Sequence, residues 1–303
     1  MRFFRKKAAK RAEIHHNNEV QNINTPCVEC DELYGKYREG KTWVGAAMAA
    51  PSLLILAVAI GLRNQDLADK LLAQIWTRCS HLGMMLTDGW RPYWSALIRC
   101  FGCLMRPRRL ERKGRLKGKK INLSKVPLYG QVVKKTNQAL SLVGVECRAL
   151  IGSLKDCIEY LKIYTIGSVI HTVHIERWWG SLRCNLAALR RRSRCLAFYE
   201  NTLETRIWIF ISLYNWVLPH KTLSEKGVFR TPAMAAGLID KVLSYEQYIK
   251  KVVLPSGGIE KRVMDKLREM AKDEWRKAAQ KTKPKPERHE LWKAPPLEEK
   301  GVA

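Results

Sequence analysis

The first hundred positions show two kinds of apolar pattern, which are short continuous runs and residues at helical spacing. Short apolar runs of strand length, each bounded by Gly, Pro, Asp or charged residues, occupy about 28–34, 42–50, 53–60 and 83–87. Runs of this length between turn signals are typical of buried strands. Residues 63–78 follow the third run and place aliphatic side chains at helical spacing, at Leu67, Leu71, Leu72 and Ile75. A helix that covers the sheet is therefore predicted between the third and fourth strands.

The rest of the chain continues this mixture. A helix is predicted over about 92–101, strands in "LYGQVVKK" and "LSLVGVECRAL", and a short helix in "SLKDCIEYLK". A stronger helix begins near Thr172, with an apolar stripe at Ile175, Trp179, Leu182, Leu186 and Leu189. The adjacent face of this helix carries Glu176, Gly180, Arg183, Ala187 and Arg190. Together these patterns predict an α/β fold with a mixed sheet flanked by helices.

The C-terminal third is predicted to be helical. An apolar helix runs through "RIWIFISLYNWV", and Thr231 and Pro232 suit the N-cap and first turn of another. A charged helix is expected from about 258, followed by a disordered Lys/Pro tail.

Residues 43–62 form twenty positions without a charge, which is long enough to span a membrane. Pro51 and Ser52 divide this stretch into two pieces of strand length. Two adjacent buried strands joined by a turn account equally for these residues, and we favour this hairpin over a membrane span.

The charge balance indicates a polyanionic partner. The chain has 55 Lys and Arg against 28 acids, a net charge of +27. Residues 106–120 alone carry nine basic residues and one acid, and are expected to form an exposed loop that binds phosphates by counterion release. Residues 1–26 look like a basic arm with little to bury. Nucleic acid is the expected partner.

Nine scattered cysteines, an odd number, indicate reduced thiols and a cytoplasmic location rather than a disulfide framework. Cys27 and Cys30 form one C-x-x-C pair, and Cys100 and Cys103 form another. Together they offer a four-thiolate zinc site. Positions three apart on a strand point to opposite faces, however, which argues against the first pair as ligands.

Three acids are the candidates for chemistry. Asp88 ends the fourth apolar run, at the carboxyl end of a predicted strand, although an Asx-turn or a helix N-cap explains an aspartate there as well. Asp31 lies in or at the end of the first strand, and Glu176 lies beside the buried stripe of the helix. Three carboxylates brought to one edge would need cations between them, and oxygen ligands suit Mg²⁺ or Mn²⁺.

Five stretches of the chain resemble one family. They are "CDELYGKY", "LTDGWRPYW", "HIERWWGSLR", "YNWVLPHKTL" and "RTPAMAAGL". In this order, over about 27–250, they are similar to blocks of the DDE transposases of the insertion sequence one family. The resemblance implies a ribonuclease-H-like catalytic domain at 27–195, with an insertion at about 103–165. A basic arm (1–26), a helical extension (196–255) and a charged helix and tail (256–303) would surround this domain.

The resemblance also implies an activity. Asp31, Asp88 and Glu176 would bind two Mg²⁺ or Mn²⁺ ions, and the enzyme would cleave DNA at an element end and join it to target DNA. Phosphate contacts would come from Arg177, Arg183, Arg190, Arg191, Arg192, Arg194, Arg108, Arg109, Arg112, Lys113, Arg115, Lys117, Lys119, Lys120, His220 and Lys221. The partners implied are double-stranded DNA and further copies of the chain, at the nucleoid and without a membrane.

The chain departs from the family pattern at three places. Trp179 stands where relatives have an Asn three residues after the glutamate, the gap from Asp88 to Glu176 is long, and only some 26 residues precede the first block. A separate polypeptide or a frameshifted fusion could supply end recognition. A catalytically inactive, DNA-binding derivative of a transposase is the alternative reading.

Overall fold

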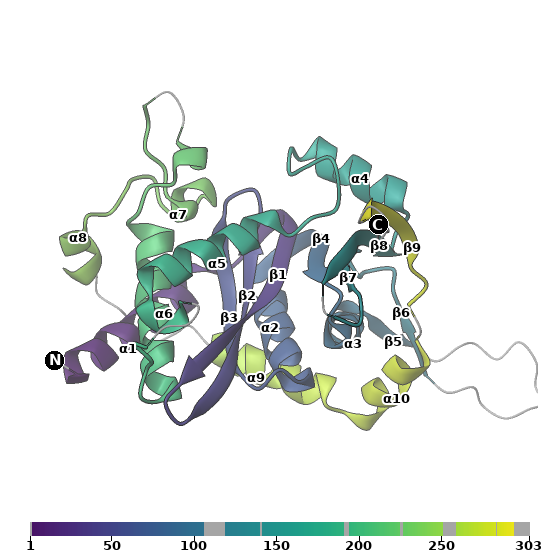
Figure 1. The fold of residues 1–303 in the computed structure, drawn as a ribbon, viewed down its shortest axis with the longest axis horizontal. Helices are drawn as coiled ribbons and strands as arrows, with labels where there is room; N and C mark the ends of the chain where they lie inside the picture. The colour runs from purple at the N-terminus through teal and green to yellow at the C-terminus, as the bar shows by residue number, and fades with distance from the viewer. Residues whose placement is uncertain are drawn as a thin grey trace, which may run out of the picture.

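A mixed seven-stranded sheet forms the centre of the fold, in the order β3-β2-β1-β4-β7-β8-β9 (Figure 1). The computed structural model describes residues 2–105, 119–139, 141–190, 194–224, 227–250, 259–282 and 284–293. The strands of the large sheet are β1 (Ile23–Tyr37), β2 (Gly40–Ala49), β3 (Leu54–Gly61), β4 (Cys79–Asp88), β7 (Leu128–Thr136), β8 (Leu142–Ile151) and β9 (Glu287–Lys293). Two short strands, β5 (Cys103–Met105) and β6 (Lys120–Asn122), pair separately.

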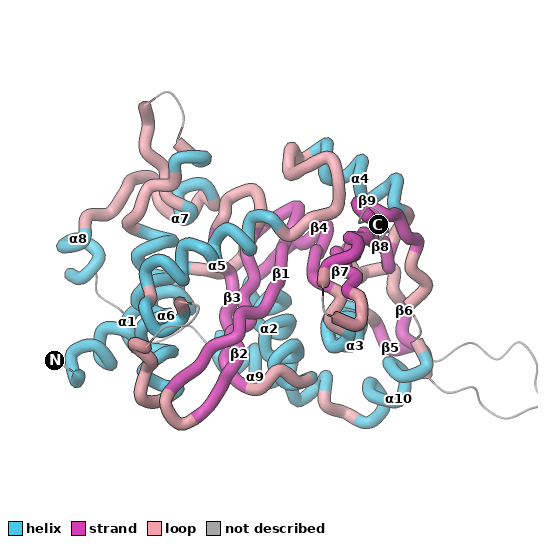
Figure 2. Tube along the Cα trace, viewed as in Figure 1, coloured by secondary structure: helices cyan, strands magenta, loops and turns pink. Residues whose placement is uncertain are grey.

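Helices cover both faces of this sheet, as Figure 2 shows with helices in cyan and strands in magenta. They are α1 (Arg2–Glu19), α2 (Gln65–Arg78), α3 (Arg91–Phe101), α4 (Leu154–Ile163), α5 (Val173–Asn185), α6 (Glu200–Trp216), α7 (Pro232–Ala235), α8 (Tyr245–Lys250), α9 (Ile259–Met270) and α10 (Asp273–Lys281). The α/β fold with a mixed, helix-flanked sheet is therefore confirmed.

The first four predicted strands and the helix between them are confirmed. β1, β2 and β3 pair antiparallel in sequence, and β4 returns parallel to β1 after α2. Asn64 caps α2 through a hydrogen bond from the Leu67 amide, which explains where this helix begins. The uncharged stretch 43–62 forms the β2–β3 hairpin, and no helix within the described ranges is both long and apolar enough to cross a membrane.

Period-2 patterning sorts side chains between the two faces of the sheet. On β2, Ala47 and Ala49 pack with α2 and α3, whereas Val44, Ala46 and Met48 pack with α5 and α6. On β1, Val28 and Cys30 belong to the α2 side, and Leu33 belongs to the α5 side. Odd-numbered positions of β1 therefore face α5, and Asp31 is one of them.

The N-terminal segment differs from its prediction as an arm with little to bury. Residues 2–19 form α1, which packs along α6. Ala9, Ala12, His16 and Val20 are buried, and His16 Nε2 lies 2.9 Å from the Leu56 carbonyl oxygen. The prediction is wrong because small residues and histidines form this buried face, so the helix lacks a strong apolar stripe.

The helix predicted from Thr172 is shorter than its apolar stripe suggested. Ile175, Trp179 and Leu182 are buried as expected, but α5 ends at Asn185. Leu186 is its C-cap, and Ala187–Leu189 form a separate 3-10 turn. Leu189 is buried from that turn, so the spacing of the stripe was right and the continuity of the helix was wrong.

The C-terminal tail also departs from expectation. Residues 287–293, predicted to be disordered, form β9 at the edge of the sheet, where they pair antiparallel with β8. The Glu287 carboxylate accepts a hydrogen bond from the Leu154 amide at the start of α4. The remainder of the predicted tail, 294–303, lies outside the described residues.

The strands predicted inside the insertion at about 103–165 extend the main sheet. β7 pairs parallel with β4, and β8 pairs antiparallel with β7. The predicted helical extension likewise shares the core, since Ile207 and Ile211 of α6 pack with Trp178 of α5. The N-cap role of Thr231 is confirmed by the hydrogen bond that its hydroxyl accepts from the Met234 amide.

Candidate metal centre

Asp31, in the middle of β1, and Asp88, the last residue of β4, lie side by side where the parallel pairing of these two strands ends. The β1–β4 pairing continues to Cys30 opposite Thr87, so the next residue on each strand is an aspartate. Carboxylate oxygens of Asp31, Glu32 and Asp88 all lie within 4.8 Å of one another. The register of the sheet itself therefore assembles an acidic group.

Asp31 points to the α5 side of the sheet. One carboxylate oxygen accepts the Glu32 amide at 2.8 Å, and the other accepts the Trp179 indole N–H at 3.0 Å. Burial raises the pKa of Asp31 to about 6, and the carboxylates of Asp88 and Glu176 contribute to the rise. The carboxylate is thus fixed in place and poorly solvated.

Glu32 is a member of the group that the sequence did not predict. Its side chain is only 2% exposed. Its Oε2 accepts two hydrogen bonds from Arg63, at 2.9 and 3.2 Å, whereas its Oε1 is buried without a hydrogen-bond partner among the described residues. Burial raises the pKa of Glu32 to about 7, and the negative charge of Asp88 contributes to this rise. A buried unpaired oxygen is a position that a cation could satisfy.

Arg63 is the cation that the structure places at this group. Its guanidinium lies 3.4 Å from Asp88 Oδ2, in addition to its bonds with Glu32. The rings of Trp43 and Trp90 both contact it, with centroids 4.9 and 4.8 Å from the Arg63 Cζ. In the sequence Arg63 directly follows the uncharged stretch 43–62, and that position does not indicate its contact with the acids.

Asp88 has two of the three structural roles that the sequence allowed: it ends a strand and forms an Asx-turn, but it does not cap a helix. It ends β4, and its Oδ1 accepts the Trp90 amide at 2.9 Å, which is an Asx-turn. The N-cap of α3 is Trp90, so Asp88 is not the helix cap. Burial raises the pKa of Asp88, while the Trp90 amide and Arg63 oppose that rise.

Glu176 reaches the same cleft from α5. An open cleft of about 620 Å³ is bordered by Asp31, Asp88 and Glu176 and by the cations Arg63, Arg91 and Lys134. Lys134 Nζ lies 3.3 Å from Glu176 Oε1, and the Thr172 hydroxyl lies 3.4 Å from the same atom. Both members of the Lys134–Glu176 pair are about half exposed, so the pair is weak. The three predicted acids therefore border one cleft, although Glu176 is not a member of the group formed by Asp31, Glu32 and Asp88.

The donor atoms fit a hard divalent ion. All are carboxylate oxygens, which suit Mg²⁺ and Mn²⁺, and three of the carboxylates carry raised pKa values because little water solvates them. A cation between them would favour the ionised forms.

The predicted phosphate-binding residues are scattered. Arg191, Arg192, Arg108, Arg109, Arg112, Lys113, Arg115 and Lys117 lie outside the described residues. Arg183 is half-buried on α5, on the same face as Glu176, and Arg177, Arg194 and Lys120 are exposed. Lys119 pairs with Glu274. Arg190 donates a hydrogen bond to the Cys184 carbonyl at 2.7 Å, so it closes the end of α5.

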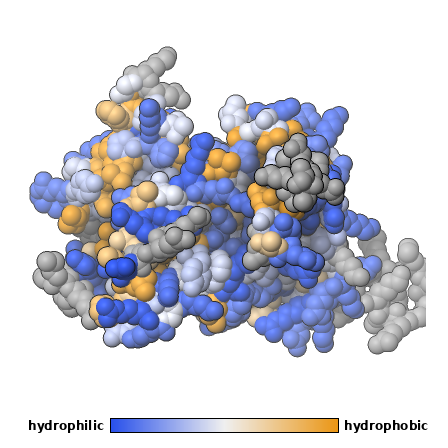
Figure 3. Space-filling model, in the orientation of Figure 1, coloured by the Kyte–Doolittle hydropathy of each residue, from blue (hydrophilic) through white to orange (hydrophobic). Residues whose placement is uncertain are grey.

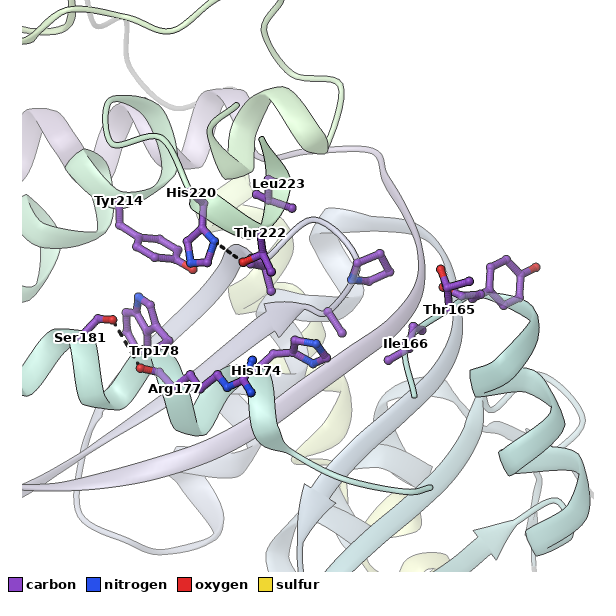
Figure 4. A pocket seen from close by; sticks show the side chains of 14 residues that line it. Thr165, Ile166, His174, Arg177, Trp178, Ser181, Tyr214, His220, Thr222 and Leu223 are labelled. Atoms are coloured by element: carbon purple, nitrogen blue, oxygen red, sulfur yellow. Dashed lines mark hydrogen bonds between the residues drawn. The ribbon is translucent and has the colours of Figure 1, made fainter. Parts of the chain in front are cut away.

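A second cavity of about 240 Å³ lies on the opposite side of α5 (Figure 4). His174 and Arg177 border it from α5, and His220 and Thr222 border it from the segment after α6. His220 Nδ1 lies 2.8 Å from the Thr222 hydroxyl, and burial lowers the pKa of His220. Lys221, beside it, is exposed. His220 is therefore neutral at pH 7 and a weak partner for phosphate.

Zinc binding by the C-x-x-C pairs is not supported. Cys27 and Cys30 are buried in different cores on opposite faces of β1. The described cysteines form no group of metal-ligating side chains, and all nine are free thiols.

No family model matches this chain, and no curated protein matches it.

Proposed function

We propose that the chain is a ribonuclease-H-like DDE transposase of the insertion sequence one type, which cleaves and joins DNA strands with divalent ions. The observation that carries this proposal is the shared cleft of Asp31, Asp88 and Glu176, which come from β1, β4 and α5. Three acids more than fifty residues apart in sequence thus border one open space. Sheet order β3-β2-β1-β4 with a central β1 is compatible with the ribonuclease-H-like arrangement.

In this proposal the three acids and Glu32 hold two Mg²⁺ or Mn²⁺ ions. Bound ions of this kind activate an attacking oxygen and stabilise a leaving one in phosphoryl transfer. The Trp179 indole and the Glu32 amide hold the Asp31 carboxylate in one orientation. Arg63 would have to release Glu32 or Asp88 when metal binds, and it would then be free to contact a phosphate.

The surface around the cleft suits a DNA backbone. Arg91 and Lys134 border the cleft itself, and Arg183 lies on the face of α5 that also carries Glu176. Figure 3 shows hydrophilic side chains over much of the face on which α5 lies. Cations beside a divalent-ion site would hold the strand while its phosphodiester lies at the acids.

The test is strand cleavage by the purified full chain. With Mn²⁺ and DNA that carries the element ends, wild type should nick and join strands, and Asp88→Asn should lower the rate by at least roughly 1000-fold, because several kcal/mol of charge stabilisation is lost. Asp240→Asn, which changes an exposed acid, is the matched control. DNA binding by Asp88→Asn should persist, since Asp88 contributes no cation.

A catalytically inactive, DNA-binding derivative is the second candidate, and one observation favours it. Trp179 stands where relatives have an Asn, and its indole N–H donates a hydrogen bond to one oxygen of Asp31. Arg63 donates hydrogen bonds to Glu32 and Asp88. If Arg63 is never displaced, the chain binds element ends but does not nick them with Mn²⁺. Wild type and Asp88→Asn would then behave alike in both binding and cleavage.

A further inference from the structure

A second group of metal-ligating side chains lies apart from the acidic cleft. It joins Glu29 on β1 to His171 and His174, which flank the start of α5. His174 Nδ1 lies 2.6 Å from Glu29 Oε1, and His171 Nδ1 lies 3.6 Å from the same oxygen. One nitrogen from each imidazole therefore converges on one carboxylate oxygen.

Glu29 is completely buried, and the two imidazoles are about one-fifth to one-quarter exposed. The second oxygen of Glu29, Oε2, accepts the Ile175 amide at 3.0 Å, at the N-terminal end of α5. The group thus contains a buried carboxylate, held by an imidazole and a backbone amide, in a site shielded from water.

We propose that Glu29, His171 and His174 form a binding site for a zinc-type divalent ion, separate from the carboxylates of the cleft. Two imidazole nitrogens and one carboxylate oxygen are ligands that Zn²⁺ prefers, whereas the all-oxygen cleft suits Mg²⁺. The described residues offer no fourth side-chain ligand to this group, so water completes the tetrahedron.

The present distances are close to those of a metal site. Two ligands about 2.0–2.1 Å from one tetrahedral ion lie about 3.3 Å from each other. The two nitrogen–oxygen distances, 2.6 and 3.6 Å, are on either side of that value. A shift of less than about 1 Å in each imidazole would bring these two pairs to it. Binding would replace the proton that now joins His174 to Glu29, since ligands must give up their protons.

The ion would tie the start of α5 to β1. Glu29 lies two positions before Asp31 on the same face of the strand, and His174 lies two positions before Glu176 on the helix. The site is therefore placed to fix the distance between the two elements that carry these acids. It does not depend on the proposed transposase activity, because metal binding can be measured without DNA.

Cobalt absorption tests the site directly. Co²⁺ added to the purified full chain should give the visible bands of a tetrahedral nitrogen–oxygen site at one equivalent. The thiolate charge-transfer band that appears when a cysteine binds Co²⁺ should be absent. Zn²⁺ should displace it. Asp88→Asn should bind Co²⁺ as wild type does, which separates this site from the cleft.

Two substitutions locate the ligands. His171→Asn and His174→Asn should each weaken Co²⁺ binding by more than roughly 100-fold, because losing a ligand costs more than losing an outer partner of one. His81→Asn, an exposed histidine on β4, is the matched control. Circular dichroism verifies that each variant is folded.

Three results would overturn the proposal. They are a wild-type chain that gives no tetrahedral Co²⁺ spectrum, a spectrum that shows thiolate bands, and binding that survives both histidine substitutions. The first needs no variant, so it decides the matter even if a substituted chain fails to fold. Loss of strand cleavage with an intact Co²⁺ spectrum would count against the proposed function alone.

Discussion

At the scale of single residues, the cleft holds more carboxylates than the cation hydrogen-bonded to them can neutralise. Carboxylate oxygens of Asp31, Glu32 and Asp88 lie within 4.8 Å of one another. Arg63 is the cation that is hydrogen-bonded to two of these residues, Glu32 and Asp88. Burial raises the pKa of all three. The ionised forms of these carboxyls are therefore disfavoured until a further cation joins Arg63.

Glu32 should make the metal-free chain less stable as pH rises. Its folded pKa is about 7, above the ordinary 4.5, so the folded state binds more protons than the unfolded state between these values. The free energy of unfolding should thus fall from pH 4.5 to pH 7. Glu32→Gln should flatten the slope between pH 6 and pH 7 in urea titrations with EDTA, whereas Asp31, with a folded pKa of about 6, should keep part of the slope below pH 6.

Glu159→Gln, at an exposed acid on α4, is the control for this measurement and should keep the wild-type slope. A Glu32→Gln chain whose stability still falls as steeply between pH 4.5 and pH 7 would show that Glu32 does not carry the effect.

Metal affinity should have the opposite pH dependence. Asp31 and Glu32, with pKa values of about 6 and about 7, must lose their protons to bind an ion. Mn²⁺ affinity, measured by calorimetry, should therefore increase from pH 5 to pH 7.5 and level off above it. An affinity that is constant over this range would contradict the raised pKa values.

The sequence predicted three of these site residues and missed others for a physical reason. Asp88 ends an apolar run and Glu176 lies beside an apolar stripe, and both they and Asp31 stand in stretches that resemble one family. Glu32 follows Asp31 on the opposite face of the strand, and Arg63 reaches back from the end of the hairpin. Their convergence depends on strand twist and side-chain reach, which spacing along one strand does not encode.

At the scale of elements, the edge strand β3 depends on a side chain from α6. The Ile55 amide donates to Asn215 Oδ1 at 3.1 Å, and Asn215 Nδ2 donates to the Ile55 carbonyl at 3.0 Å. Asn215 is fully buried and takes the place of a further strand at this point of the edge. The amide thereby joins the helical layer to the sheet.

Asn215→Ala should destabilise the fold by roughly 2–4 kcal/mol, because it leaves a buried N–H and a buried C=O unpaired. Urea unfolding measures this change. Asn201→Ala, at an exposed position of the same helix, should cost less than about 0.5 kcal/mol. A loss below that figure for Asn215→Ala would show that water or relaxation satisfies Ile55.

The opposite edge of the sheet depends on β9. Truncation after residue 282 removes the strand that covers β8 and the Glu287 bond to α4. The uncovered edge should cause self-association, visible by light scattering at micromolar concentration. Truncation after residue 293 keeps β9 and should remain monodisperse to the extent that the full chain is. Equal behaviour of the two truncations would contradict this role of β9.

Element prediction succeeded where periodicity was clear and failed where partners came from afar. The β2–β3 hairpin and α2 follow directly from their apolar spacing. β9 has a largely exposed, charged sequence, so only its pairing with β8 makes it a strand. The buried face of α1 contains alanines and histidines, which carry little signal without α6 beside them.

At the scale of the whole molecule, the net charge of +27 should dominate DNA binding. The logarithm of the observed affinity should fall linearly with the logarithm of salt concentration. Arg177→Gln and Arg183→Gln should each reduce the slope by about one if each contacts a phosphate. Fluorescence anisotropy from 50 to 300 mM salt measures the slope.

Lys119→Gln provides a comparison within the same chain. Lys119 already pairs with Glu274, so its removal should change the salt slope by less than the arginine substitutions do. A slope that is the same for all variants would mean that phosphate contacts come from other residues.

The account depends on one pocket that three distant acids build for divalent ions, and Mn²⁺ binding tests it most directly. Electron paramagnetic resonance of free Mn²⁺ should show saturable binding by the wild-type chain at pH 7.5, and Asp31→Asn, Asp88→Asn and Glu176→Gln should each weaken it at least roughly tenfold, while Asp240→Asn should not. Mn²⁺ binding that is unchanged in Asp31→Asn and Asp88→Asn would contradict the account.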